Sequence, residues 1–446
     1  MPVFSKQDLK KLIIPLIIEQ ALALTIGMAD TIMVSSCGEA AVSGISLVDS
    51  INQLLIAVFS ALATGGSVVA AQYLGRRENK MASQSARQLV YATALLSVGV
   101  MVLCLCFSEP LIGTVFGQIT QDVYDAALTY FLLSVISYPF LALYNAGAAL
   151  FRAMGNSKIS MINSLIMNVI NIALNAVFIF LCGWGVFGAA LATLIARIIG
   201  AVIILKMLSN RDLPAYVDRY VRGFTLNMGM IRAILRVGIP NSCENGMFQV
   251  GKLLVASIVS IFGTVSIAAN AVCNSISGLM LIPGSAMGFA MITVIGQCMG
   301  AGRVEEAKAY TRQLMRWTYL FVWCVDAVIM LLGYPLLSLY GLSNETTELA
   351  HTLVILYGSA AMVIWPLAFT LPNALRASGD VTFTMVVAIA TMWLFRLGGG
   401  YVLAVPMGMG VVGLYVGMFI DWLFRLILFV WRYKSGRWSR KKLLDT

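Results

Sequence analysis

The chain has 446 residues, of which 60% are hydrophobic and only 11% are charged, and its mean hydropathy is +0.88. Soluble domains usually carry about 25% charged residues, so this composition excludes a water-soluble globular protein and indicates a polytopic helical membrane protein. The formal net charge of +10 does not indicate nucleic-acid binding, because the basic residues are scattered among short polar segments.

Apolar stretches recur along the whole chain, and each is long enough to cross about 30 Å of hydrocarbon as a helix. The first half predicts spans over 12–34, 44–72, 88–108, 124–150, 158–181 and 185–206. The second half predicts spans over 237–261, 266–297, 313–334, 348–374, 382–405 and 411–431. The fold class that follows is an all-α membrane protein with twelve transmembrane helices in two pseudo-symmetric six-helix bundles.

The polar stretch between the two sets of spans predicts the domain organisation. We expect an N-terminal bundle over 1–206, a cytoplasmic connector over 207–232, a C-terminal bundle over 233–433 and a basic tail over 434–446.

The distribution of basic residues predicts the orientation. All lysines and arginines fall on one side of the alternating spans, except four that lie within spans: Arg197, Lys252, Arg396 and Arg425. By the positive-inside rule, both termini are expected in the cytoplasm.

The second half of the chain repeats the first about 225 residues later. Ile14-Pro15, Glu19, Gln72 and Gly75 recur as Ile239-Pro240, Glu244, Gln297 and Gly300, and Arg152 and Gly155 recur one residue out of step as Arg376 and Gly379. Duplicated bundles are typical of secondary transporters. The repeat therefore points to transport as well as to a fold.

Several ionisable residues lie within the predicted spans. A charge at the bilayer centre costs about 2.5–3.5 kcal/mol even on the most lenient scale, so each must face protein or water and is a functional candidate. They are Glu19, Asp30, Asp49, Arg197, Glu244, Lys252, Asp326, Arg396, Asp421 and Arg425.

Glu19 and Glu244 each follow a proline, Pro15 or Pro240, by one helical turn. Proline breaks a backbone hydrogen bond and can kink a helix, so we interpret both prolines as hinges and both acids as candidates for coupling protonation to bending. The alternative is that each glutamate hydrogen-bonds a backbone group freed by its proline.

Asp30 follows Glu19 on nearly the same helical face, about 16 Å farther along. Its counterpart in the repeat is Val255, which suggests that the first half carries more of the ion chemistry. A capping or network role is the alternative for Asp30.

The last two predicted spans carry Arg396, Asp421 and Arg425, which we interpret as a structural ion network. Arg197 can play the same part in the first half. Lys252 follows Glu244 by about two turns and is either its counter-charge or a side chain that snorkels to the interface.

The remaining candidates are weaker. Asp49 and Asp326 are secondary site candidates, and the amide face formed by Asn163, Asn168, Asn171 and Asn175 serves either helix packing or contact with substrate or ions. The single histidine, His351, excludes a histidine proton relay, so proton coupling must use carboxylates. The cysteines are dispersed, and no metal-ligand cluster or cofactor is predicted.

Six stretches resemble the multidrug and toxic-compound extrusion (MATE) family, and their order and spacing extend over nearly the full chain. In the first half they are Gly27-Met-Ala-Asp30-Thr-Ile-Met-Val34, Gly38-Glu-Ala-Ala-Val-Ser-Gly44 and Gln72-Tyr-Leu-Gly75. In the second half they are Ile239-Pro-Asn-Ser-Cys-Glu244-Asn, Gly296-Gln-Cys-Met-Gly-Ala-Gly302 and Leu375-Arg-Ala-Ser-Gly-Asp380.

The resemblance implies a bacterial cytoplasmic-membrane antiporter that exports bulky, often cationic organic compounds in exchange for H⁺ or Na⁺. The family's first-helix aspartate corresponds to Asp30 and its seventh-helix glutamate to Glu244, whereas Glu19 resembles an additional acid of some bacterial members. The predicted span 348–374 has no carboxylate after Glu348. This departure from the NorM pattern favours H⁺ over a NorM-like sodium site, with Na⁺ at Asp30 or Glu244 as the alternative.

We therefore expect Glu19, Asp30 and Glu244 to line a solvated cavity in which organic cations and coupling ions compete. The chain is expected to be a monomer, not an enzyme, with the lipid bilayer as its surroundings. A flippase for a lipid-linked precursor is the alternative function, but it needs a basic cavity, and the acids of the first half argue against that.

Overall fold

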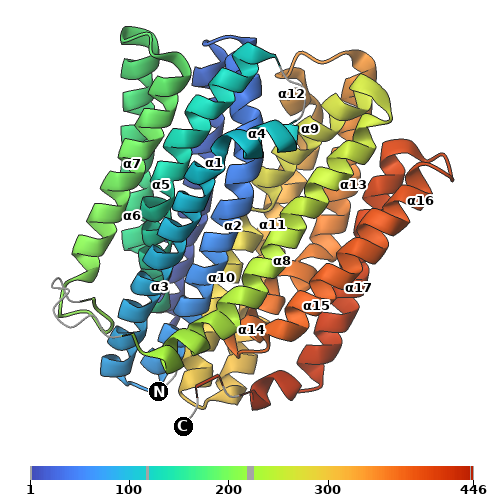
Figure 1. The fold of residues 1–446 in the computed structure, drawn as a ribbon. Coiled ribbons are helices and arrows are strands. Elements are labelled where there is room, and N and C mark those ends of the chain that lie inside the picture. Colours follow the sequence, from blue (N-terminus) through green and yellow to red (C-terminus); the bar gives the residue numbers. More distant parts are fainter. Residues whose placement is uncertain (1–2, 117–119, 218–225, 442, 445–446) are drawn as a thin grey trace. The chain divides into compact units, whose positions relative to one another are not determined.

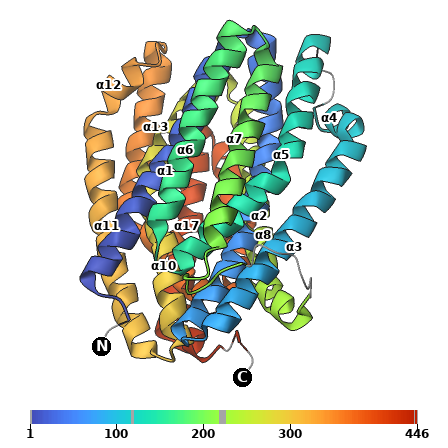
Figure 2. The same ribbon diagram turned by 90° about the vertical axis from the view of Figure 1, so that its left-hand side faces the viewer.

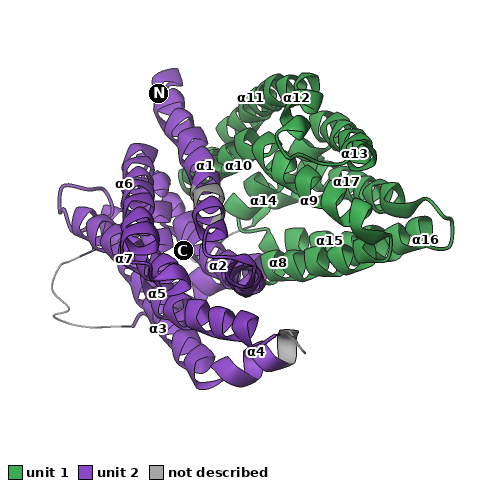
Figure 3. Cartoon of the chain, turned by 90° about the horizontal axis from the view of Figure 1, so that it is seen from above, with its two compact units in different colours: residues 1–4, 243–446 green, residues 5–242 purple. Residues whose placement is uncertain are grey.

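The computed structural model describes residues 3–116, 120–217, 226–441 and 443–444, and most of these residues are helical, with no β-strand among them (Figure 1). The chain divides into two compact units, coloured separately in Figure 3. We call residues 5–242 the N-unit, and residues 1–4 with 243–446 the C-unit.

The N-unit is built around α5, which packs along α2, α7 and α3 (Figures 1 and 2). Its core includes the fully buried rings of Phe59, Phe131 and Tyr138. Its helices are α1 (Lys6–Ser35), α2 (Glu39–Gly75), α3 (Asn79–Cys106), α4 (Ser108–Phe116), α5 (Gln121–Ala153), α6 (Ser157–Asn175) with its π-helical extension η1 (Ala176–Leu181), α7 (Gly185–Leu208) and the start of α8 (Met228–Ser260).

The C-unit has an aromatic core around Trp422, whose ring packs edge-on against Tyr357 and Phe369 at centroid distances of 5.3 and 5.7 Å. After α8 its helices are α9 (Gly263–Met280), α10 (Ile282–Gly300), α11 (Val304–Leu331), α12 (Gly333–Ser338), α13 (Asn344–Val363), η2 (Pro366–Thr370), α14 (Pro372–Ala377), α15 (Val381–Thr391), η3 (Met392–Gly399), α16 (Gly400–Ala404), α17 (Gly410–Lys434) and η4 (Arg437–Arg440).

The predicted transmembrane helices are all present as helices. Among the described residues, nine helices are long and apolar enough to cross a membrane, or ten when α13 and α14 are counted as one bent span. The two remaining predicted spans contain α1 and α8, which carry charged side chains such as Glu19 and Glu244. The polytopic all-α fold class is confirmed.

Two predicted spans are broken. The span 266–297 divides at Leu281 into α9 and α10, because Pro283 in the first turn of α10 cannot continue the hydrogen-bonding of the preceding helix. Its counterpart in the first half, α2, runs unbroken for 37 residues. The span 348–374 bends by 62° between α13 and α14. Apolar periodicity alone did not predict either break.

The boundary between the units lies within α8 rather than in the predicted connector 207–232. The first turns of α8 belong to the N-unit because Asn241 donates to the carbonyl of Ala61 (3.3 Å) and Ser242 to that of Val58 (3.2 Å). Residues 218–225 of the connector and residues 442 and 445–446 of the tail lie outside the described residues.

The described parts of the connector and tail are anchored. The backbone N–H of Tyr216 donates to Ser83 (3.2 Å) on α3. In the tail, Trp438 is fully buried and its Nε1 donates to the carbonyl of Tyr433 (2.9 Å). The N-terminus of α1 carries a capping box, in which the hydrogen bonds from Ser5 lower the pKa of the Asp8 carboxyl outside the membrane.

A close backbone contact joins α2 to the start of α8. A Cβ atom at Gly65 would lie 2.7–2.8 Å from backbone atoms of Gly238 and Ile234, whereas one at Gly99 on α3 would meet nothing within 4 Å. We expect Gly65→Val to destabilise the fold by about 1–3 kcal/mol, because overpacking forces the backbones apart. Gly99→Val is the matched control. Equal thermal unfolding midpoints of the two variants in detergent would contradict this packing.

Candidate functional site

Glu19 is an ion-paired acid. It is 5% exposed on α1, and its Oε1 accepts a hydrogen bond of 2.7 Å from Arg152 Nη1 in the last turn of α5. Its Oε2 accepts a second bond of 2.7 Å from the hydroxyl of Ser160 on α6. Both carboxylate oxygens are therefore held, and the pair ties the proline-bearing helix α1 to the ends of two neighbours.

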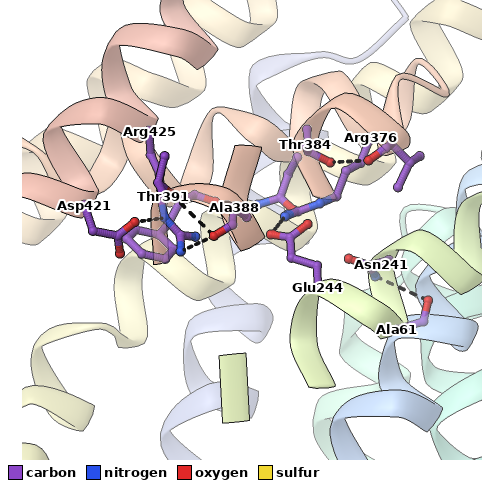
Figure 4. A network of polar contacts seen from close by, with 12 residues as sticks. Ala61, Asn241, Glu244, Arg376, Thr384, Ala388, Thr391, Asp421 and Arg425 are labelled. Atoms are coloured by element: carbon purple, nitrogen blue, oxygen red, sulfur yellow. Dashed lines mark hydrogen bonds and ion pairs between the residues drawn. The ribbon is translucent and has the colours of Figure 1, made fainter. Parts of the chain in front are cut away.

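The C-unit repeats this arrangement (Figure 4). Arg376 Nη2 lies 2.5 Å from Glu244 Oε1, and Arg376 Nη1 donates to Asn373 Oδ1 (2.8 Å). Thr384 stands where the repeat has Ser160, but its hydroxyl bonds to the carbonyl of Val381 (2.8 Å). Within the described residues, Glu244 Oε2 is buried without a hydrogen-bond partner.

Asp30 is held differently from the two glutamates. Its Oδ1 accepts a bond of 2.7 Å from the side-chain amide of Asn175, which also donates to Asn171 Oδ1 (3.2 Å). Asn171 in turn donates to Thr193 on α7 (3.1 Å). Among the described residues, no basic side chain lies within ion-pair distance of Asp30. This half-buried carboxylate is therefore oriented by a neutral amide rather than by an ion pair.

Asp49 on α2 extends the acidic network. Its Oδ1 accepts bonds from Asn52 (3.3 Å) and from the hydroxyl of Tyr130 (3.4 Å). Asp30 and Asp49 both interact electrostatically with Arg197, whose Nη1 donates to Ser137 (2.6 Å). Two acids face one base at this site, so its net charge is negative.

The amide face on α6 has a mixed role. Asn163 donates to the carbonyl of Gly200 (2.8 Å) and Asn168 to that of Ser164 (3.1 Å), which are packing contacts. The side-chain oxygens of Asn163, Asn168 and Asn175 are nevertheless buried without partners among the residues described. The face thus provides acceptors on the same helix as the amide that holds Asp30.

The predicted ion network in the last spans forms only in part. Asp421 Oδ1 accepts a 2.8 Å bond from Arg425 Nε, and Arg425 Nη2 donates to the carbonyl of Ala388 (2.9 Å), which links α17 to α15 (Figure 4). Arg396 is not bonded to this pair. It lies in η3 with its guanidinium 5.4 Å from the ring centroid of Phe248.

The other predicted residues are dispersed. Asp326 is fully buried on α11 in the C-unit, and neither oxygen has a partner within the described part of the chain. Pro15 and Pro240 lie inside α1 and α8, which both continue through them. Lys252 does not pair with Glu244, which is bonded to Arg376 instead.

The ranges that the structure describes contain no cluster of three His, Cys, Asp or Glu residues suited to a metal ion.

The C-unit contains a cavity of about 380 Å³ that sequence reasoning missed. Helices α8, α9, α15 and α17 and the bent segment after α13 contribute to its lining, which includes Glu244, Lys252, Arg376, Arg396 and Arg425. The sequence signal for this cavity was the number of basic residues well inside predicted spans, which is three in the second half (Lys252, Arg396 and Arg425) and one in the first (Arg197).

The model of the MatE family matches residues 15–177 and again residues 240–402, so the second match begins 225 residues after the first. The chain belongs to the MatE family. The two matches also confirm the internal duplication, and the family comprises membrane transporters rather than enzymes.

The similarity to known proteins extends over almost the whole chain. An uncharacterized transporter of Bacillus subtilis, YisQ, is 26% identical over 436 residues, which cover 96% of this chain and 94% of that protein. A probable multidrug resistance protein NorM of Thermotoga maritima is 25% identical over 452 residues, with 98% and 94% covered. A solved MOP superfamily transporter from Pyrococcus furiosus, described with the words "reverse polarity of binding pocket suggests different function", has the same fold at 21% identity, with a TM-score of 0.90 and coverage of 98% and 97%.

The Glu19–Arg152 pair has a thermodynamic signature. Removing one partner leaves a buried charge uncompensated, so we expect Glu19→Gln to cost about 3–5 kcal/mol of stability. The double variant with Arg152→Gln should lose less than the sum of the single changes. Glu305→Gln, at the exposed Glu305–Lys308 pair, is the control. The measurement is unfolding by SDS in mixed micelles, and additive losses would disprove the coupling.

Proposed function

We propose that this MatE-family protein is a secondary active antiporter that exports small organic cations in exchange for H⁺ by alternating access. The observation that carries the proposal is the environment of the Asp30 carboxylate. Its carboxylate is oriented by the Asn175 amide, lies beside Asp49, and has no paired cation among the described residues. A site of net negative charge attracts cations and favours their binding over that of anions.

Competition at Asp30 can couple the two fluxes. A carboxylate that has bound a proton is neutral and no longer attracts an organic cation, so the two guests exclude each other. If the unneutralised acid disfavours the conformational switch, each switch carries either a proton or the drug. Asn175 positions the carboxylate, and the acceptor oxygens of α6 offer hydrogen bonds to a cationic guest.

Glu19 and Glu244 enter this proposal in a different role. Each is held by an arginine, so each can bind a cation only after that arginine has been released. Protonation of either acid weakens its ion pair and frees the proline-bearing helix, α1 or α8, from the helix end to which it is tied. These two acids are therefore proposed as couplers of protonation to helix movement rather than as the first contact of the substrate.

Sodium is the alternative coupling ion, with Asp30 as the better-placed carboxylate because Glu244 has an arginine as its partner. The absence of any acid after Glu348 in the described segments α13 and α14 favours H⁺. We further propose the cytoplasmic membrane of a bacterium as the location, with both termini in the cytoplasm and a monomer as the working unit. The one-sided distribution of lysine and arginine and the bacterial relatives support this.

The flippase for a lipid-linked precursor remains the second candidate, and one observation favours it. Such a function needs a basic cavity, and the lining of the C-unit cavity is basic. The acidic network around Asp30 has no use in binding a pyrophosphate, which is why we prefer the cation exporter.

The decisive experiment uses the purified protein in vesicles loaded with a fluorescent organic cation, with either a proton or a sodium gradient imposed. We expect the proton gradient to drive transport and Asp30→Asn to reduce the driven rate by about tenfold or more. Asp122→Asn, at an exposed acid in the first turn of α5, is the matched control. Undiminished proton-driven transport by Asp30→Asn would refute the assignment, and translocation of a lipid-linked pyrophosphate instead of the cation would favour the flippase.

A further inference from the structure

The C-unit cavity has the dimensions of a ligand site. Every residue that lines it belongs to the C-unit, and its volume of about 380 Å³ falls within the range of small-molecule pockets. It does not contain Asp30, Asp49 or the amide face of α6. It is therefore a second candidate site, separate in the chain from the acidic network.

The charge of this cavity is positive. Arg376 is paired with Glu244, and Arg425 with Asp421. Lys252 and Arg396 also line the cavity, and no carboxylate in the described part of the chain lies within ion-pair distance of either. The two cations are near enough to interact with each other electrostatically, and Arg396 also interacts with Asp421, which is already paired with Arg425. Two like charges facing one low-dielectric cavity repel, and an anion between them would relieve that repulsion.

Hydrogen-bond donors without acceptors surround the same cavity. The Nε atoms of Arg376 and Arg396 and the indole Nε1 of Trp422 are buried and have no partner among the described residues. Trp422 is only 2% exposed. Leaving a buried donor without an acceptor is destabilising, so these groups favour a ligand that brings acceptor oxygens.

Several aromatic rings also line the cavity. Trp365 and Phe369 stack at a centroid distance of 5.3 Å, and Phe369 meets Trp422 edge-on. The guanidinium of Arg396 lies over Phe248. A wall of this kind accommodates a flat apolar body, because ring faces and edges both offer favourable contacts.

The duplication shows that these charges are specific to the second half. At the 225-residue offset of the two family matches, Lys252 and Arg425 correspond to Gly27 and Gly200, and Asp30 and Asp49 correspond to Val255 and Asn274. The second half has cations where the first has glycine, and neutral residues where the first has acids. One scaffold therefore presents opposite charge in its two copies.

We propose that the C-unit cavity binds an amphipathic organic anion, with its phosphate or carboxylate head between Lys252 and Arg396 and its apolar body against Trp365, Phe369 and Trp422. Charge-assisted bonds from both cations hold the head. The site goes beyond the proposed cation export, because it takes the opposite charge and does not use Asp30. A soluble organic phosphate and the headgroup of an anionic lipid share this chemistry.

The test is calorimetric binding of 1-naphthyl phosphate to the full-length protein in nanodiscs of zwitterionic phosphatidylcholine, without an ion gradient. We expect Lys252→Gln and Arg396→Gln each to weaken binding by about tenfold or more. Lys252→Arg should retain it, as should Lys158→Gln, which removes a charge from α6 in the N-unit. Neutral 1-naphthol should bind more weakly than the phosphate and be indifferent to these substitutions. Unfolding midpoints close to that of the unaltered protein confirm that each variant is folded.

The outcomes separate the possibilities. If the unaltered protein fails to bind 1-naphthyl phosphate, or binds naphthol equally well, the anion site is wrong. If Lys252→Gln and Arg396→Gln bind as the unaltered protein does, it is also wrong. Competition by phosphatidylglycerol in the nanodisc supports the site with a lipid headgroup as its occupant, and lack of competition supports it with a soluble anion. The Asp30→Asn variant should still bind 1-naphthyl phosphate. The anion site can therefore be confirmed even if the proposed cation export is refuted.

Discussion

The fold of each unit depends first on an ion pair that occurs once in each half of the chain. In this pair, a glutamate one turn after a helix proline bonds to an arginine at the end of another helix. Glu19 pairs with Arg152 in the first half, and the equivalent residues of the repeat, Glu244 and Arg376, pair in the second. Each pair is largely buried, so its charges are stable only together. Because proline weakens the helix at the turn before each glutamate, the arginine bond compensates for a local loss of rigidity. The pairs fix α1 and α8 at the places where these helices could most easily bend.

On that shared scaffold the two halves have opposite charge. The N-unit groups Asp30 and Asp49 around one arginine and buried amide oxygens, whereas the C-unit groups Lys252 and Arg396 around a cavity walled by aromatic rings. Duplication preserves backbone geometry because packing constrains it, but polar side chains that face a cavity are freer to change. A repeated fold therefore need not imply repeated chemistry.

The sequence was sufficient for the elements that depend on apolar length and period. It predicted the helical spans, the division into two related halves and the isolation of Asp30 from the repeat. It did not reveal the break before Pro283, because the apolar run 266–297 is continuous in composition. It predicted that Glu19 and Glu244 line a cavity together with Asp30 and did not predict their ion pairs, although Arg152 and Arg376 recur together with them. That joint recurrence was the signal for the ion pairs. The network of Arg396 with Asp421 was predicted because they lie in consecutive spans, whereas in the structure the guanidinium of Arg396, on the π-helical segment η3, lies over the ring of Phe248.

The break between α9 and α10 has a mechanical consequence. As a continuous rod, α2 is about 55 Å long, nearly twice the thickness of the hydrocarbon layer, whereas α9 and α10 measure less than about 30 Å each. A continuous helix as long as α2 adapts to a thinner or thicker bilayer by tilting as a whole. Two jointed segments can instead change their angle at Leu281. The composition of the surrounding lipid therefore acts unequally on the two copies of the repeat.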